Sequence, residues 1–369
     1  MIHDVWVEVD LAALRHNLRQ VRGTVGDNVK IAAVVKGNGF GHGYIEPSRA
    51  FIQAGADSLA VTRIEEALPL RKAGITAPIM LFAPVQPANA DEAVAANLDI
   101  TITSVSLAQA ISDAGEQQKK LARVYVKVDT GMGRLGVLPV DVPAFFQSIR
   151  GLPNIAVIGI YTHFATAADA DISLARNQLR IFQRVLEKLE KAGFDYGIAS
   201  AANSSAILRL PESRFDMVRP GTLLYGQYPS PHVPHSLDLK PTWKLKARVC
   251  EVKTLPKGTA VGYGAEYTLR QSTRTAVIPI GYADGFTLIP EGPVYRQSIL
   301  KFAAKKRRRQ LSVEIRGRKA KVIGRVAMQM IVVDVTGING VEVGDEVTIP
   351  AMRIPTNALI PRVYVDSDA

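Results

Sequence analysis

The chain has 369 residues, 47% of them hydrophobic, and a formal net charge of +11. These values argue against a disordered chain and leave room for two folded domains. Its single cysteine, Cys250, excludes an intrachain disulfide, and we expect neither a signal peptide nor a membrane helix, which needs about 20 apolar residues. We therefore predict a cytoplasmic protein.

From about residue 29 to 225, short apolar runs rich in β-branched residues alternate with helical patterns. The strand candidates are 29–35, 58–62, 78–82, 98–103, 122–128, 155–161, 196–200 and 215–218. The clearest helical patterns are 63–74, 106–118 and 172–193, with a further helix over 10–26 before the first of these strands. This alternation predicts a parallel (β/α)8 TIM barrel. An open doubly wound sheet is the alternative, but no G-x-G-x-x-G follows a first strand.

After about residue 238, strands alternate with Gly and Asp turns and show little helical pattern. We therefore predict a barrel domain over 1–238 and a mostly β C-terminal domain over 239–369, with the first residues, to about residue 10, packing beside the latter.

The segment 301–310 holds six basic residues, KFAAKKRRRQ, and accounts for much of the excess charge. Anionic partners are favoured by such a charge. However, aromatic residues do not alternate with the basic ones, so a solvated surface loop is the preferred interpretation and nucleic acid is not an expected partner.

Polar residues follow five of the predicted barrel strands at the ends where a TIM barrel carries its chemistry. Lys36 ends the first strand, residues 129–134 follow the fifth, and His163 follows the sixth. Residues 200–204 follow the seventh strand, and Arg219 with Gly221 follows the eighth. We expect all of these groups to meet at one mouth.

Lys36 is the candidate for covalent chemistry. Burial at the end of an apolar strand disfavours its ammonium form, and a neutral amine condenses with the aldehyde of pyridoxal 5'-phosphate. Glycines at every second position of the segment 37–43 would let a planar ligand approach the backbone. The alternative is a lysine at a strand end that simply reaches solvent.

The loops after the seventh and eighth strands are the usual phosphate site of this architecture. Asn203 and the hydroxyl of Ser204 are candidates there, with the backbone amides of Gly221 and Thr222. A helix N-cap is the alternative function of this serine- and asparagine-containing segment.

Arg219 cannot give up its proton, so opposite a pyridine nitrogen it would leave that ring unprotonated and a weaker electron sink. Carbanion reprotonation at the same carbon is then favoured. His163 could connect Arg219 to a second base. The alternative is that His163 is an ordinary hydrogen-bonded histidine of the core.

Nine motifs occur in one order along the chain: KGNGFGHG, KVDTGMGRLG, THFATA, AANS, RPG, VGYGAEYT, IGYADGF, GRVAMQM and PRVYV. Together they resemble the alanine racemase family of fold-type III pyridoxal-phosphate enzymes, whose lysine motif is K-A-N/D-A-Y-G-H-G. The resemblance covers nearly the whole chain and implies interconversion of L- and D-alanine, supplying D-alanine for peptidoglycan, without a metal.

By this resemblance, Lys36 holds the cofactor and acts as the base on one face of the substrate, while Tyr263 serves the opposite face. The family's tyrosine comes from a second subunit, which implies a head-to-tail homodimer. Arg134 corresponds to a residue that contacts cofactor and substrate carboxylate, and Met328 to one whose amide meets that carboxylate. Lys127 corresponds to a lysine that is often carbamylated and then orients the arginine.

Four residues depart from the family pattern. Phe40 and Ala358 stand where tyrosines that contact the phosphate are expected, Gln329 replaces an aspartate, and Ser200 replaces a common histidine. We therefore expect weaker retention of the cofactor and a wider mouth. Two alternatives follow: a racemase of broader specificity, acting on serine or lysine, or a weakly active cofactor-binding protein with a basic docking insert. The presence of bases for both faces argues against the second.

Overall fold

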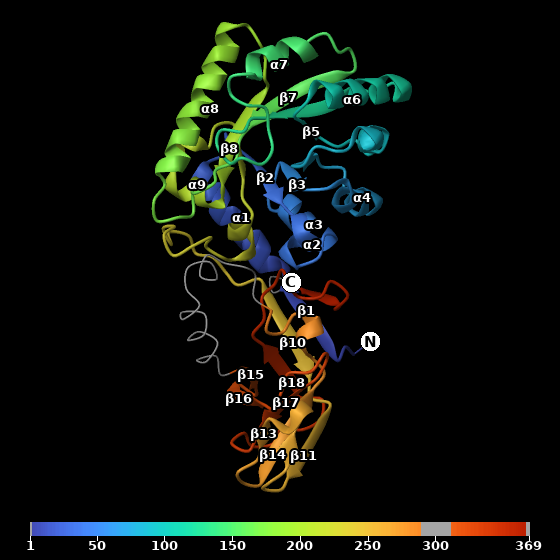
Figure 1. Cartoon of the computed structure of the whole chain (residues 1–369), viewed down its shortest axis with the longest axis vertical. Coiled ribbons are helices and arrows are strands. Elements are labelled where there is room, and N and C mark those ends of the chain that lie inside the picture. Colours follow the sequence, from blue (N-terminus) through green and yellow to red (C-terminus); the bar gives the residue numbers. More distant parts are fainter. Residues whose placement is uncertain (1, 289–310, 367–369) are drawn as a thin grey trace. The chain divides into compact units, whose positions relative to one another are not determined.

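The computed structural model describes residues 2–288 and 311–366, so the basic insert 301–310 lies outside the described residues. These residues form two compact units (Figure 1). A barrel unit contains residues 11–242 with Asp366, and a β unit contains residues 2–10, 243–288 and 311–365. Each unit is described by itself.

The barrel unit is built on parallel strands, eight of them among its described residues, in the order β4-β3-β2-β9-β8-β7-β6-β5. They are β2 (Lys30–Val34), β3 (Ser58–Val61), β4 (Ile79–Leu81), β5 (Ile100–Ile102), β6 (Ala122–Lys127), β7 (Ile155–Tyr161), β8 (Ile198–Asn203) and β9 (Met217–Arg219). A parallel bridge between Met80 and Asp99 joins β4 to the start of β5 and brings the ends of the sheet together. The predicted barrel is therefore confirmed.

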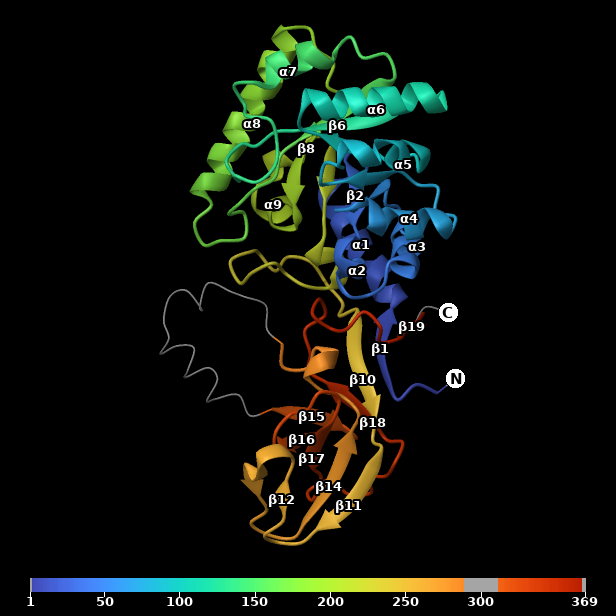
Figure 2. The ribbon, with the colours of Figure 1, turned by 45° about the vertical axis from the view of Figure 1, so that its right-hand side comes forward.

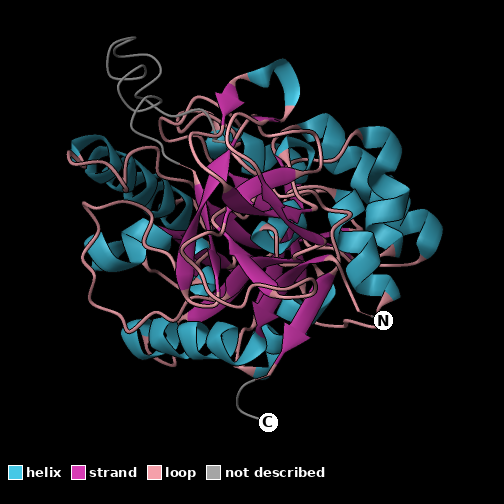
Figure 3. Ribbon diagram, turned by 90° about the horizontal axis from the view of Figure 1, so that it is seen from below, coloured by secondary structure: helices cyan, strands magenta, loops and turns pink. Residues whose placement is uncertain are grey.

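Helices connect these strands and surround them, as Figure 3 shows. They are α1 (Leu11–Val25), α2 (Lys36–Phe40), α3 (Ile45–Gln53), α4 (Ile64–Lys72), α5 (Ala90–Ala95), α6 (Val105–Gln118), α7 (Val142–Ile149), α8 (Ser173–Lys191) and α9 (Ser204–Arg209), with the short 3-10 helices η1 (Pro87–Asn89), η2 (Pro211–Ser213) and η3 (Thr222–Tyr225). α8 is typical of the covering helices, because its buried residues Ala175, Leu179, Phe182 and Leu189 recur at helical spacing on one face.

The inside of the barrel is filled by side chains. A cluster in the barrel core combines small residues such as Ala32 and Ala60 with Met80, Tyr125 and Tyr161. Gly159 on β7 leaves the space that the Tyr125 ring occupies, since a Cβ there would lie 2.2 Å from that ring. The two tyrosines are therefore part of the packed interior of the barrel.

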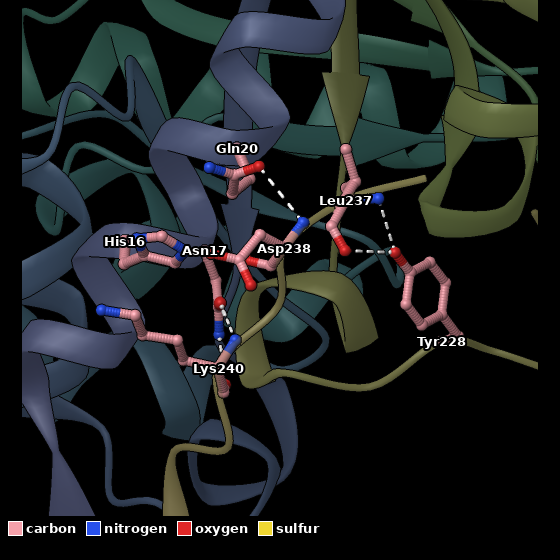
Figure 4. A network of polar contacts seen from close by, with 7 residues as sticks. All are labelled: His16, Asn17, Gln20, Tyr228, Leu237, Asp238 and Lys240. Atoms are coloured by element: carbon pink, nitrogen blue, oxygen red, sulfur yellow. Dashed lines mark hydrogen bonds and ion pairs between the residues drawn. The ribbon is translucent and has the colours of Figure 1, made fainter. Parts of the chain in front are cut away.

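The last part of the barrel unit runs back across α1 and is fastened to it by polar contacts (Figure 4). The Asn17 side chain donates to the Lys240 oxygen at 2.9 Å and accepts from the Lys240 amide at 2.8 Å. The Tyr228 hydroxyl accepts from the Leu237 amide and donates to the Leu237 oxygen, both at 2.7 Å, and these two bonds close a loop. Residues 228–242, a segment rich in Pro and His that follows the last barrel strand, are thus packed against the barrel unit.

The β unit contains one mixed sheet with the order β11-β14-β17-β16-β15-β18-β10-β1-β19, several strands of which are visible in Figure 2. Its strands are β1 (Val5–Asp10), β10 (Trp243–Arg248), β11 (Glu251–Leu255), β14 (Thr273–Ile278), β15 (Ser312–Ile315), β16 (Arg318–Ile323), β17 (Ile331–Asp334), β18 (Glu346–Ile349) and β19 (Arg362–Val365). The hairpin of β12 (Ala260–Val261) and β13 (Tyr267–Thr268) and the 3-10 turns η4 (Tyr263–Ala265) and η5 (Tyr282–Asp284) complete the unit. The predicted mostly β character of this part of the chain is confirmed.

Strand β1 belongs to this sheet although it opens the chain. It pairs antiparallel with β10 and parallel with β19. Among the helices of the described residues, none has both the length and the apolar character needed to cross a lipid bilayer.

Candidate active site

Lys36 follows β2 at the C-terminal ends of the barrel strands, where its side chain is open to solvent. Its Nζ lies 5.8 Å from the centre of the Phe82 ring. The protein atoms around it remove part of its hydration, and this desolvation, with the charge of Arg134, lowers the pKa of Lys36 against an opposing effect of Glu66. The neutral amine is therefore more accessible than in a free lysine.

The backbone after Lys36 forms a left-handed turn within the segment assigned to α2. Gly37, Asn38 and Gly39 have φ angles of 62°, 55° and 57°. Glycine adopts this conformation at little cost, which gives the alternating glycines a conformational role. Within this turn the Gly37 amide donates to Oε1 of the buried Glu66 at 2.8 Å.

Tyr161 lies beneath two basic side chains. The Lys127 Nζ is 4.7 Å and the Arg219 Cζ is 5.0 Å from the centre of its ring. The Tyr161 hydroxyl donates to the Phe82 oxygen at 3.0 Å, and burial raises its pKa to about 12, so the ring stays neutral. Burial and the positive charges of Arg219 and Arg134 lower the pKa of Lys127 to about 7.

Arg219 is almost fully buried at the end of β9. Its guanidinium donates to the Ser200 hydroxyl, to the Thr162 oxygen at 2.5 Å and to the Ala201 oxygen at 3.2 Å. Burial lowers the pKa of Arg219 to about 10, so it remains charged at neutral pH. Ser200, one of the departures from the family pattern, is therefore a direct hydrogen-bond partner of this arginine.

His163 follows β7 with a half-buried side chain. Burial, then the charges of Arg219, Lys127 and Lys36, lower its pKa well below the usual 6.5. The imidazole is therefore neutral at physiological pH. Gln178 of α8 holds the backbone here, since it donates to the His163 oxygen at 3.1 Å.

The predicted phosphate site brings Ser204 and Gly221 together. The Gly221 amide donates to the Ser204 hydroxyl at 2.8 Å, and Thr222 begins η3 directly afterwards. A Cβ at Gly221 would lie 3.0 Å from the Phe40 ring, so a larger residue there would require the ring to shift by a few tenths of an ångström. Asn203 instead caps α9, with its side-chain oxygen accepting from two backbone amides of the first turn, which is the alternative recognised in the sequence.

Arg134 ends a loop that Asp129 organises. One carboxylate oxygen of Asp129 accepts from the amides of residues 131, 132 and 133 at 2.8–3.1 Å, and the other accepts from the Arg134 amide at 3.1 Å. Burial opposes ionisation, but these four amides lower the pKa of Asp129. The loop therefore carries the exposed Arg134 side chain on a fixed backbone.

Tyr263 and Met328 belong to the β unit, whereas all the preceding residues belong to the barrel unit. Tyr263 begins η4 and is 69% exposed, and Met328 is 58% exposed. The Met328 oxygen accepts from the Ala283 amide at 3.0 Å, which fixes the backbone beside η5. Both side chains are therefore presented at the surface of the described β unit.

Comparison with known proteins decides the family. The family model for the alanine racemase N-terminal domain matches residues 9–229, and the model for the C-terminal domain matches residues 242–359. The chain is 40% identical to an alanine racemase of Desulforamulus reducens, covering 99% of this chain and all of that protein, and 39% identical to one of Methanococcus maripaludis, covering 94% and 89%.

The chain belongs to the alanine racemase family. It is accordingly an amino-acid isomerase. Solved structures agree: a Clostridium difficile alanine racemase matches with a TM-score of 0.90 at 30% identity, covering 100% of this chain and 97% of that one. An alanine racemase of Bacillus anthracis with bound L-Ala-P matches with a TM-score of 0.86 at 28% identity, again covering 100% and 97%.

Sequence reasoning missed two residues of this alanine racemase family site. Tyr161 stands in a predicted strand, and an aromatic residue in an apolar run gives no sign that two cations will lie over it. Glu66 stands in the first turn of a predicted helix, where a glutamate usually accepts hydrogen bonds from that helix's own amides. Its contact with Gly37 could not be read from sequence, because it depends on how the β2 loop turns.

Proposed function

We propose that the chain interconverts L-alanine and D-alanine with pyridoxal 5'-phosphate, using Lys36 and the Tyr263 of a second subunit as bases on opposite faces of the substrate. Family membership supports the reaction. The observation that carries the residue roles is the convergence of Lys36, Arg219 and the Ser204–Gly221 pair at the ends of β2, β9 and β8, which are neighbours in the sheet.

The residues present fit a phosphate-bearing cofactor. The site contains four basic side chains, those of Lys36, Lys127, Arg134 and Arg219. Positive charges from this set contribute to the lowered pKa values of Lys127 and His163. Such a positive field favours an anionic occupant. The Ser204 hydroxyl accepts from the Gly221 amide and would donate its own hydrogen to the phosphate. The Arg219 guanidinium would face the ring nitrogen.

When bound, the cofactor would draw electron density from the substrate α-carbon and so make its proton removable. Lys36, whose pKa is lowered, can hold the α-proton on one face at its Nζ. The Tyr263 hydroxyl would exchange a proton on the other face, and Arg134 would bind the substrate carboxylate through its guanidinium. Inversion requires both bases, because a single base returns the proton to the face that it left.

A head-to-tail homodimer follows from this proposal. Tyr263, Tyr282, Met328 and Met330 are all large, substantially exposed side chains of the β unit. Exposed aromatic and methionine side chains are enriched at protein interfaces. They support a surface that meets the barrel mouth of another copy.

Mixing two inactive variants tests the two-subunit site. Lys36→Ala and Tyr263→Phe are each expected to lose nearly all racemisation. Subunits exchanged between them should recover about a quarter of the wild-type rate, because half of the randomly formed symmetric dimers then contain one complete site. No recovery, with mixed dimers verified by mass, would contradict a site shared between subunits.

Two further expectations stay proposals. D-Alanine made by this chain would supply peptidoglycan, and the protein would act in the cytoplasm, as its cysteine content suggests.

Incubation with L-alanine in deuterated water tests the chemistry: deuterium should enter the α-carbon at the same time as D-alanine forms. Deuterium exchange at the α-carbon without formation of D-alanine would show that Lys36 acts as a base without Tyr263.

A further inference from the structure

Glu66 is a buried carboxylate at the start of α4 that accepts hydrogen bonds from two separate places in the barrel. Its Oε2 accepts from the amides of Thr62 and Arg63 at 2.8 and 3.2 Å. Its Oε1 accepts from the Gly37 amide at 2.8 Å and from the Tyr44 hydroxyl at 3.2 Å. The side chain is 4% exposed, so the carboxylate depends on these four neutral donors in place of water.

Only one half of this arrangement serves the helix. A glutamate in the first turn satisfies amides that have no partner within the helix, and Oε2 does this for α4. The bonds to Oε1 instead reach the segment that follows β2. Glu66 therefore connects the fixed N-terminus of α4 to the backbone next to Lys36.

The connected backbone needs such support. Gly37, Asn38, Gly39 and Phe40 all have positive φ angles, and for the two residues with a Cβ this conformation is unfavourable. The Gly37 amide follows Lys36 directly, so its bond to Glu66 fixes the backbone on one side of Lys36 while β2 fixes it on the other, and the φ and ψ angles of Lys36 are constrained together. A donor–acceptor bond at this amide therefore controls how the lysine leaves the strand.

We propose that Glu66 is a positioning residue: it holds the left-handed turn at residues 37–39 and thereby sets the direction of the Lys36 side chain. This inference rests on the proposed catalytic role of Lys36. Glu66 also provides a negative charge near the amine, which favours its protonated form against desolvation and the charge of Arg134. The carboxylate thus acts on Lys36 through both geometry and charge.

The test compares the full-length wild type with Glu66→Gln and with Glu65→Gln, all freed of bound cofactor. Glu65 is the exposed neighbour in the same helix, so its variant makes the same chemical change without touching the turn. In Glu66→Gln an NH2 group replaces one of the two carboxylate oxygens. The two donors that face that oxygen then lose their hydrogen-bond acceptor. Hydrogen exchange of peptides covering residues 36–44 should rise about tenfold or more, the effect of losing one charge-assisted bond.

The second measurement is the pH dependence with which an amine reagent labels Lys36, followed on the same peptide. Its midpoint should move to lower pH in Glu66→Gln and remain at the wild-type value in Glu65→Gln. With cofactor restored, kcat should fall in Glu66→Gln while KM changes little, because the substrate-binding Arg134 lies on another loop. Equal exchange and equal labelling midpoints in the two variants would overturn the proposal.

Should Glu66→Gln fail to fold, Glu66→Asp replaces it. This variant keeps the charge but withdraws the carboxylate by one methylene group, so exchange at 36–44 should rise while the labelling midpoint stays near that of the wild type. Unchanged exchange would refute the positioning role. Failure of the proposed function can be distinguished from failure of the positioning role. In that case the wild type would not racemise alanine, whereas the measurements on the cofactor-free protein would still report on Glu66.

Discussion

The side-chain nitrogen of Lys127 lies 4.7 Å from the centre of the Tyr161 ring, and Arg219 covers the same ring at 5.0 Å. Two cations over one neutral aromatic ring repel each other while both are buried. The ring quadrupole offsets part of this repulsion. Burial first, and then the charges of Arg219 and Arg134, lower the pKa of Lys127 to about 7.

A pH-dependent stability follows for Lys127→Met. The lysine pKa is lower in the folded chain than the 10.5 of its reference value, so between about pH 7 and 10.5 the unfolded chain binds more protons and stability rises with pH. Below pH 7 the charged lysine costs up to about 5 kcal/mol. The methionine variant should therefore be more stable than the wild type at pH 6 and similar near pH 10, as urea unfolding of the cofactor-free protein can measure. A constant difference across this range would contradict the assignment.

The lowered pKa also leaves much of Lys127 as a free amine at neutral pH, the form that reacts with carbon dioxide. Carbamylation of Lys127 stays a prediction from the family resemblance. Labelled bicarbonate should produce a carbamate resonance that disappears in Lys127→Met.

Arg219→Lys should reduce both stability and activity. A lysine has no planar fork and cannot reach the Ser200 hydroxyl and the oxygens of Thr162 and Ala201 together. Each buried acceptor left without a donor costs about 1–3 kcal/mol. We expect a lower urea midpoint and a loss of kcat of at least about tenfold. Wild-type kcat in this variant would show that the guanidinium fork does not matter to the reaction.

Phe40→Tyr should tighten cofactor binding. The Phe40 ring stacks on Tyr225 with centroids 4.7 Å apart and lies against Gly221, beside the proposed phosphate site. A hydroxyl added there can supply one hydrogen bond, worth roughly 1 kcal/mol or about fivefold in the dissociation constant. Titration of the cofactor-free protein measures it, with Phe40→Leu as the control that removes the ring. Equal affinity in wild type and Phe40→Tyr would place the phosphate elsewhere.

Ala358→Tyr should narrow the substrate range. Ala358 is exposed on the β unit, so a larger side chain can be accommodated without disturbing the core. If this position borders the substrate entrance, as the family resemblance predicts, the variant should lose kcat/KM for serine and lysine more than for alanine. Equal losses for all three substrates would count against a wider entrance in the wild type.

The barrel could be predicted in detail because its strands are buried on both sides and appear as apolar runs. All eight predicted strand segments overlap observed strands, from β2 at Lys30–Val34 to β9 at Met217–Arg219. The placement of Lys36 and Arg219 at strand ends followed from the same pattern. Loop geometry did not, because the φ angles of Asn38 and Phe40 depend on contacts such as that of Gly37 with Glu66.

Asn203 shows the limit for single motifs. The sequence allowed either a phosphate contact or a helix cap, and the cap bonds use the side-chain oxygen. The two possibilities could not be separated from residue type, since both require a short polar side chain before a helix. The roles of Tyr263 and Met328 stay predictions, because they depend on a second subunit.

The strand pairing between β4 and β5 consists of the single Met80–Asp99 bridge, so this joint of the barrel is shorter than the pairing between its other neighbouring strands. β4 and β5 have three residues each, and around this joint Arg71 bonds the oxygens of Ile75, Ala77, Ala96 and Asn97 while Arg123 pairs with Asp99. These side-chain contacts add to the two backbone hydrogen bonds of the joint, which link Asp99 to Ile79 and Leu81 at 2.9 Å. For protein engineering, a cut in the link between β4 and β5 would leave less barrel ladder to rebuild on reassembly than a cut between any other two barrel strands that follow each other in the chain.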